Sequence, residues 1–353
     1  MIVLAMLHFL DHVYLISSNA SLEAALDLLQ YPVLLVMAAD IFRRKIPINK
    51  FLLMVAATAV FGISMVCSGS VTMLKYLLVL FYVQKCNQKK LYHKLFRIHS
   101  MAIMAVLILS VLGILPSTVV RRGYSTLGFS HSNMLAANVF SCLCCYVLSR
   151  PKKLSGRQYI LLILCIVAVY FLTDSRTSVL CMAGFVAVLF ALERCSFLMR
   201  RGLSRTCIVS LPVVLAVLSW WAGMSRRTGS AFIMKLDELL SWRLTLADNF
   251  MQVLTPQLWG QRVTMNLVEN TYLVCMYKDG IIPLLVMCLL IALSLKKNMK
   301  RRDAAKVACM IGFLIHGLTE VTAFNPFFNV TLLTKFFDIR RDCGHDNNFY
   351  SDI

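Results

Sequence analysis

The chain has 353 residues, of which 59% are hydrophobic and 15% are charged, and its mean hydropathy is +0.73. Soluble domains are about 45–50% apolar and about 25% charged, so the composition excludes an ordinary soluble protein. The net charge of +19 does not indicate nucleic-acid binding, because the basic residues stand in short runs that flank apolar segments. We therefore expect an integral membrane protein that contacts the lipid bilayer and binds no nucleic acid.

Apolar runs long enough for helical spans follow one another along the whole chain and predict about twelve membrane helices. The first run begins at Met1 without a basic leader, which favours a first span or signal anchor over a cleaved signal peptide. The predicted spans are residues 2–17, 24–41, 51–67, 71–83, 98–115, 132–148, 159–172, 178–192, 207–221, 271–293, 307–318 and 327–337.

Clusters of Lys and Arg fall after every second predicted span and at the end of the chain. Because basic residues collect on the cytoplasmic side of a membrane protein, this alternation predicts that both termini are cytoplasmic. The cell membrane of a bacterium is the expected location. The basic clusters lie within residues 43–50, 85–97, 150–157, 194–205, 296–306 and 335–341.

On the opposite side the sequence predicts one long extracytoplasmic loop, at about residues 222–270. Its stretch "MKLDELLSWRLTLADNFMQVL" spaces apolar residues as an amphipathic helix does, so we expect a small helical cap. The fold class is thus all-α: a polytopic membrane bundle over residues 1–338, followed by a polar cytoplasmic tail at 339–353. The thirteen cysteines show no disulfide or zinc spacing, and we predict no metal site and no cofactor.

Several arginines lie on the side of the membrane that should be poor in them. For Arg226 and Arg227 we favour simple anchoring at the interface. Arg176, in the short turn "TDSRTS", is different, as are Arg243 on the cap helix and Arg262 in "WGQRV". Guanidinium groups bind phosphate oxygens through two parallel hydrogen bonds and stay charged, so their convergence would suit a diphosphate.

Four segments, in order, resemble motifs of the bacterial O-antigen polymerase and ligase superfamily. They are "LGFSHSNMLAAN", "YFLTDSRTSVLCMAG" with its Ser-Arg pair, "LSWRLTLADNFMQVLTPQLWGQ" and "ENTYLVCMYKDGIIPLL". The resemblance covers about residues 120–325. It implies a glycosyltransferase that needs no metal and uses an undecaprenyl-pyrophosphate-linked glycan, which it transfers to another glycan or to lipid A core. A regulator of chain length is a further partner of such enzymes.

The resemblance also suggests roles for individual residues. Arg176 and Arg243 would bind the diphosphate. Glu269 stands where ligases have a histidine; it is either the general base or an acid that stabilises a helix N-terminus. Arg262, His131, Asn270, Tyr272 and Asp174 complete the expected substrate site; His131 could equally begin a helix, and Asp174 could orient Arg176.

Two other interpretations remain open at this stage. A transporter of lipid-linked oligosaccharide also has about a dozen spans, and an O-antigen ligase shares the motifs. The triplet His8, Asp11 and His12 resembles a proton relay, although we favour packing for it. His316 and Glu320 are four residues apart on a predicted helix and are candidates to face the pocket.

Overall fold

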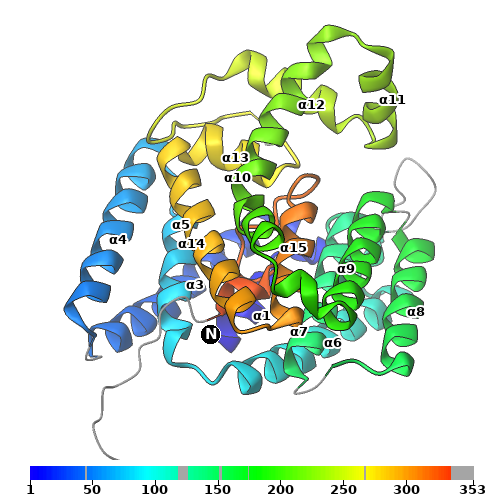
Figure 1. Ribbon diagram of the computed structural model, residues 1–353. Coiled ribbons are helices and arrows are strands. Elements are labelled where there is room, and N and C mark those ends of the chain that lie inside the picture. Colours follow the sequence, from blue (N-terminus) through cyan, green and yellow to red (C-terminus); the bar gives the residue numbers. More distant parts are fainter. Residues whose placement is uncertain (44–45, 118–125, 151–152, 174, 266–267, 335–353) are drawn as a thin grey trace, which may run out of the picture.

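The computed structural model is built from helices (Figure 1). It describes residues 1–43, 46–117, 126–150, 153–173, 175–265 and 268–334. Within these ranges the strand-like pairing is limited to an isolated antiparallel bridge between Val13 and Phe129. The predicted tail at 339–353 and the predicted site residue Asp174 lie outside the described residues.

Among the described residues, eight helices are long and apolar enough to cross a membrane, which identifies a multi-pass helical membrane protein. The apolar helices α5 (Thr72–Tyr82) and α15 (Ala304–His316) are shorter. The eight are α3 (Ala20–Phe42), α4 (Ile48–Ser68), α6 (Gln88–Val111), α7 (Ser132–Ser149), α8 (Gly156–Thr173), α9 (Arg176–Arg194), α10 with the following 3-10 turn (Gly202–Thr228), and α14 (Ile281–Lys300).

Four of the twelve predicted spans do not form membrane-length helices in the described residues: those at α5 and α15 form shorter helices, and those at 2–17 and 327–337 do not form one continuous helix. The run at 2–17 divides into α1 (Ile2–Leu10) and α2 (Tyr14–Ser17), because Val13 is extended and bridges Phe129. At the other end of the chain, the run at 327–337 contributes the 3-10 helix η5 (Val330–Leu333). Hydropathy measures how apolar a segment is, and it cannot distinguish a membrane span from a short segment buried in protein.

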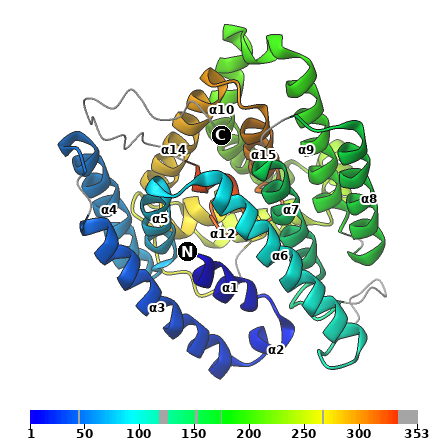
Figure 2. The same ribbon diagram turned by 90° about the horizontal axis from the view of Figure 1, so that it is seen from below.

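The helices differ in how much of their surface the bundle covers. In the most hydrophobic window of α7, 72% of the residues are buried, against 22% for α3. Leu35 on α3 and Phe171 on α8 are exposed, as expected for side chains that face lipid. Figure 2 shows α3 and α4 on one side of the bundle and α8 and α9 on the other, with α7 and α15 between them.

After α15 the chain turns into the interior of the bundle and runs through residues 317–334 without a long helix. Phe324, Val330 and Leu332 are buried there among the helices. Side chains bind the irregular backbone: the amide of Asn329 donates to the carbonyl of Ala323 at 2.7 Å. Non-helical backbone inside a membrane bundle is tolerated when protein groups satisfy it in this way.

The segment between α10 and α14 carries a small cap of two helices, α11 (Ala231–Leu239) and α12 (Arg243–Val253), at the top of Figure 1. Arg226 donates from Nε to the fully buried carboxylate of Asp237 at 3.0 Å, and Arg227 pairs with Asp248. These two arginines therefore hold the cap to the end of α10, where the sequence suggested simple interfacial anchors.

Two glycines let the end of the cap segment cross the chain between α13 (Thr271–Val274) and α14. Gly260 and Gly280 both have positive φ, and a Cβ built on Gly280 would lie 2.5 Å from the backbone nitrogen of Gly260. Backbone hydrogen bonds fix the crossing, since the amide of Ile281 donates to the carbonyl of Gln257 at 3.0 Å. Residues with a side chain cannot occupy either position without moving the backbone.

We expect Gly280→Ala to destabilise the protein, because its backbone conformation (φ 114°, ψ 161°) is nearly restricted to glycine and costs about 1–3 kcal/mol for other residues. The clash with Gly260 adds to this. The control is Gly184→Ala on α9, where the added methyl meets open space and the helix gains about 0.5–1 kcal/mol. Thermal unfolding in detergent should show a lower Tm for the first variant; equal Tm values would contradict the crossing.

Candidate functional site

Arg243 lies between two carboxylates that come from distant parts of the chain. Its Nη1 is 2.9 Å from Oε2 of Glu269, and its Nη2 is 2.9 Å from Oε1 of Glu320. The Arg243 side chain is 11% exposed. The arrangement joins α12 to the residue that precedes α13 and to the segment that follows α15. It fixes one guanidinium group at the base of the cap.

The backbone before Arg243 is strained. Ser241 and Trp242 both have positive φ, at 58° and 65°, a region that costs a residue with a side chain about 1–2 kcal/mol. Asp237 holds this turn, since its carboxylate accepts from the amide of Leu244 at 2.8 Å and its carbonyl accepts from the amide of Trp242. Because the turn is fixed, the first residue of α12 is directed toward the bundle.

The two glutamates differ in their access to solvent. The side chain of Glu269 is 42% exposed, whereas that of Glu320 is 4% exposed. Glu320 lies beyond the end of α15 and outside the candidate spans. Burial raises the pKa of Glu320 to about 7, against the opposing effect of Arg243. Near neutral pH the site therefore contains one carboxylate that is readily displaced and one that titrates.

His316 connects the same region to the start of α9. Its Nδ1 lies 2.7 Å from Oγ1 of Thr322, and its Nε2 lies 3.2 Å from Oγ of Ser178. The structure ends α15 at His316, so His316 and Glu320 do not share a helix face as the sequence suggested. They diverge: Glu320 reaches Arg243, and His316 reaches a serine two residues after Arg176.

The predicted diphosphate-binding residues lie at the starts of two helices. Arg243 begins α12 and Arg176 begins α9, where its side chain is exposed. Arg262 is exposed and lies against Gly69, the left-handed residue that ends α4. Within the described residues, the structure thus joins Arg243 directly to Glu269 and places Arg262 beside the turn between α4 and α5.

Asn270 and Tyr272, predicted as substrate-binding residues, have structural positions. The side-chain oxygen of Asn270 caps α13 by accepting from the amides of Tyr272 and Leu273, each at 3.0 Å. Its amide group donates to the carbonyl of Leu318. Tyr272 is fully buried and donates to the carbonyl of Leu314 at 2.8 Å. We therefore assign both residues to the support of Glu269.

His131 caps α7 through Nδ1, which accepts from the amide of Asn133 at 3.5 Å. This is the helix-start role that the sequence left open. The side chain of Asn133 forms a hydrogen bond with Glu320, so the first turn of α7 still contributes to the site. No sequence pattern predicts this bond, because Asn133 and Glu320 are far apart along the chain.

A second polar cluster lies between α1, α3 and α5. Asp11 accepts from Gln30 at 3.3 Å, Lys75 contacts both Gln30 and Asp27 at 3.3 Å, and Nε2 of His8 lies 3.0 Å from the amide nitrogen of Asn325. Sequence reasoning treated the first residues as a triplet on one helix. His8 contacts His12 and Asp11 within the triplet, and the cluster is completed by Gln30 on α3 and by Asn325 in the irregular segment after α15, which a pattern within one helix cannot reveal.

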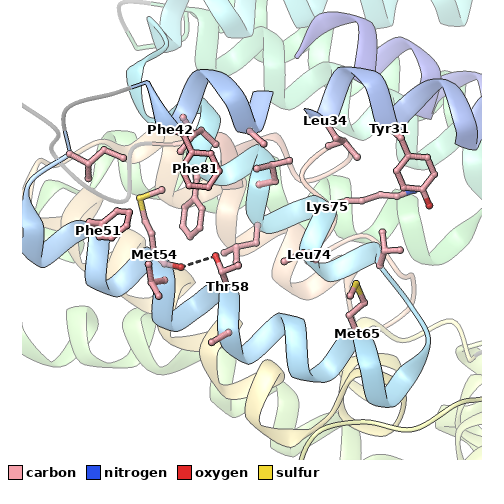
Figure 3. Close-up of a pocket in the computed structure, with 18 residues that line it drawn as sticks. Tyr31, Leu34, Phe42, Phe51, Met54, Thr58, Met65, Leu74, Lys75 and Phe81 are labelled. Carbon is pink, nitrogen blue, oxygen red and sulfur yellow. Dashed lines mark hydrogen bonds between the residues drawn. The ribbon is translucent and has the colours of Figure 1, made fainter. Parts of the chain in front are cut away.

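Lys75 also borders the large apolar pocket between α3, α4 and α5 (Figure 3). The cavity volume is about 790 Å³, and Lys75 is the one charged residue among the described residues that line it. Tyr31 and Lys75 lie toward one end, and Phe42 and Phe51 toward the other. A mostly apolar lining of this kind suits a hydrocarbon chain.

No protein-family model, curated protein or solved structure matches this chain. In the part of the chain that the structure describes, no group of three or more His, Cys, Asp or Glu side chains is arranged to hold a metal ion.

We expect Tyr272→Phe to lower the free energy of unfolding by about 1–3 kcal/mol, because the buried carbonyl of Leu314 loses its partner. Tyr170→Phe on α8 is the control, since Tyr170 is 40% exposed. The measurement is the Tm of each purified variant in a thermal unfolding experiment. If Tyr272→Phe unfolds at the wild-type temperature, its hydroxyl does not have the structural role assigned here.

Proposed function

We propose that this chain is a membrane glycosyltransferase that polymerises oligosaccharide repeat units linked to undecaprenyl pyrophosphate. The product would be a capsule, exopolysaccharide or O-antigen chain, made on the outer face of the bacterial cytoplasmic membrane. One observation carries the proposal. The segments that resemble the polymerase and ligase superfamily supply Asn133, Ser178, Arg243 and Glu269. Arg243 is bonded to Glu269 and to Glu320, Asn133 is bonded to Glu320, and His316, whose backbone carbonyl binds the amide of Glu320, contacts Ser178.

The proposed reaction needs few protein groups, because the bond between sugar and diphosphate is already activated. The hydroxyl of the acceptor sugar attacks the anomeric carbon of the donor, and the bond to the diphosphate oxygen breaks. Undecaprenyl pyrophosphate leaves with the electron pair, while the hydroxyl proton passes to a base. Arg243, which is 11% exposed, and Arg176, which is exposed, would stabilise the charge that develops on the leaving group, as positioned cations do at a developing anion.

Glu269 is the candidate base. Its side chain is 42% exposed, so an acceptor sugar can reach it, and its present partner is Arg243. When a diphosphate takes that guanidinium group, the carboxylate is released to accept a proton. General-base assistance of this kind typically accelerates a reaction by about 10²–10⁴-fold.

The proposed orientation follows from the charges at the ends of the helices. α9 ends at Arg194, and α14 ends at Lys300, next to Arg301 and Arg302. The cap and Arg243 lie at the opposite end of the helix pair α10 and α14. Basic residues favour the cytoplasmic side, so the cap would face outward and the two termini inward.

The second polar cluster favours a different candidate function, transport of a lipid-linked oligosaccharide. Ionisable residues within a membrane bundle are expensive and commonly mark ion or substrate pathways. Asp11 has a buried oxygen, Oδ1, without a hydrogen-bond partner among the described residues. A polymerase makes longer glycans, whereas a transporter moves the unchanged substrate across the bilayer, so the two functions can be distinguished.

The direct test uses purified protein in nanodiscs with a lipid-linked repeat unit. We expect a ladder of products that differ by one repeat, resolved by gel electrophoresis or mass spectrometry. Movement of unchanged substrate across the bilayer of sealed vesicles, with no ladder, would replace the polymerase by a transporter. Transfer of a single preformed chain to lipid A core would indicate a ligase.

Replacing Arg176 with alanine should lower the rate of polymerisation by roughly 10²–10³-fold, the usual effect of losing one donor to a developing oxyanion. Arg157→Ala is the matched control, because Arg157 is also an exposed arginine in the first turn of a helix, at the far end of the α8–α9 pair. Both variants should reach the membrane in normal amounts. A normal ladder from the Arg176 variant would remove this residue from the mechanism.

A further inference from the structure

We propose that Glu320 is a positioning residue whose protonation makes Arg243 available to a diphosphate. In its ionised form Glu320 would hold and neutralise the guanidinium group; in its neutral form it would still hold the group but leave its charge to the ligand. This inference rests on the proposed function, since the ligand is the diphosphate of the lipid-linked donor.

The first argument is the balance of charge around Arg243. One guanidinium group faces two carboxylates, each at 2.9 Å. If both carboxylates are ionised, the three groups together carry one negative charge, and an anionic diphosphate is repelled. Departure of Glu269 alone leaves Arg243 neutralised by Glu320. As far as the groups around Arg243 are concerned, binding of an anion is therefore favoured when Glu320 loses its charge as well.

The second argument is that the two carboxylates have different freedom to move. Glu269 is 42% exposed and can turn into solvent when a ligand arrives. Glu320 is enclosed: its carbonyl accepts from Oγ1 of Thr271 at 2.7 Å, and its amide donates to the carbonyl of His316 at 2.9 Å. With its backbone fixed at both points, Glu320 responds to a ligand by changing protonation more easily than by moving away.

The groups that face Glu320 come from each element packed against it. They are Arg243 from α12, Glu269 ahead of α13, Asn133 from α7 and Cys181 from α9. Of these, Arg243 favours the ionised carboxylate and Glu269 opposes it. Burial is the largest influence and disfavours the charge, as it does for any carboxylate removed from water.

Protonation also leaves the geometry intact. A neutral carboxyl group keeps a carbonyl oxygen that accepts from Nη2 of Arg243, so the guanidinium group stays in place while its charge is no longer compensated. The proton comes from solvent and is bound by Glu320 as the diphosphate enters. When undecaprenyl pyrophosphate leaves, Glu320 releases this proton to solvent, so one proton is bound and one is released in each cycle.

The test measures binding of a defined probe, undecaprenyl pyrophosphate bearing one N-acetylglucosamine, to purified protein in nanodiscs. This diester has no ionisation near neutrality. For the wild type we expect Kd to rise about tenfold per pH unit above the pKa of Glu320, which is about 7, because one proton is taken up with the ligand. Glu320→Gln should bind with a nearly constant Kd over the same range.

Two control variants show whether the effect belongs to Glu320. Glu269→Gln should keep the rise of Kd with pH, because Glu320 still titrates in it. Glu193→Gln should match the wild type; Glu193 is a buried glutamate at the opposite end of α9, bonded to the hydroxyl of Tyr159. If Glu320→Gln does not fold, calorimetry of the wild type in buffers of different ionisation enthalpy counts the proton directly.

Equal pH profiles for the wild type and Glu320→Gln, or binding without proton uptake above neutrality, would overturn the inference and leave the proposed function standing. If neither the wild type nor any variant binds the probe at any pH, the proposed function is overturned, and this inference with it.

Discussion

Residues 317–334 pass through the interior of the bundle without a regular helix, and the rest of the structure is arranged to satisfy them. Amide and carbonyl groups of a non-helical backbone have no partners within a helix, and where they are buried they need other hydrogen-bond partners. Asn329 binds the carbonyl of Ala323, and Oγ1 of Thr271 both donates to the carbonyl of Glu320 and accepts from the amide of Ala323. The need to satisfy this segment fixes α13, α15 and, through Glu320, the position of Arg243.

The same segment connects the two polar clusters of the molecule. At one end Glu320 binds Arg243 beneath the cap, and further along Asn325 lies 3.0 Å from His8 on α1. The short helix α1 therefore has a reason to stop at Leu10: it packs against this segment and does not run on as a span. The extended residue Val13 interrupts the helix, and α2 then turns toward α3.

Sequence patterns predicted the helices whose periodicity and length are set locally. The long apolar runs became α3, α4, α6 to α10 and α14, because a bilayer favours any apolar helix of sufficient length. They were misleading at 2–17 and in the described part of 327–337, where the helices are short. On α1, Leu4 and Phe9 are buried in protein while Val3 and Met6 are exposed. The two runs contact each other through His8 and Phe327, and no local signal reports such a contact.

The candidate site shows the same division between local and distant information. Arg243 and Glu269 could be selected from their motifs, and the cap of His131 on α7 from its place before an apolar run. The bond from Arg243 to Glu320 joins residues 77 positions apart, and the bond from Asn133 to Glu320 is longer still in sequence. The full burial of Tyr272 and its bond to the carbonyl of Leu314 also depend on distant residues, and a motif within one segment does not report them.

The strain before Arg243 and the two carboxylates around it are consistent with the proposed function. If Arg243 binds and releases a diphosphate in each cycle, as proposed, a mobile guanidinium group in the empty site would lose side-chain entropy every time. The positive-φ turn at Ser241 and Trp242 and the buried bond to Glu320 hold it before the ligand arrives. Such a clamp would bind its own counter-ion more tightly than the substrate if both carboxylates were buried. One exposed and one titratable carboxylate is the combination that keeps the arginine ordered and still lets it exchange partners.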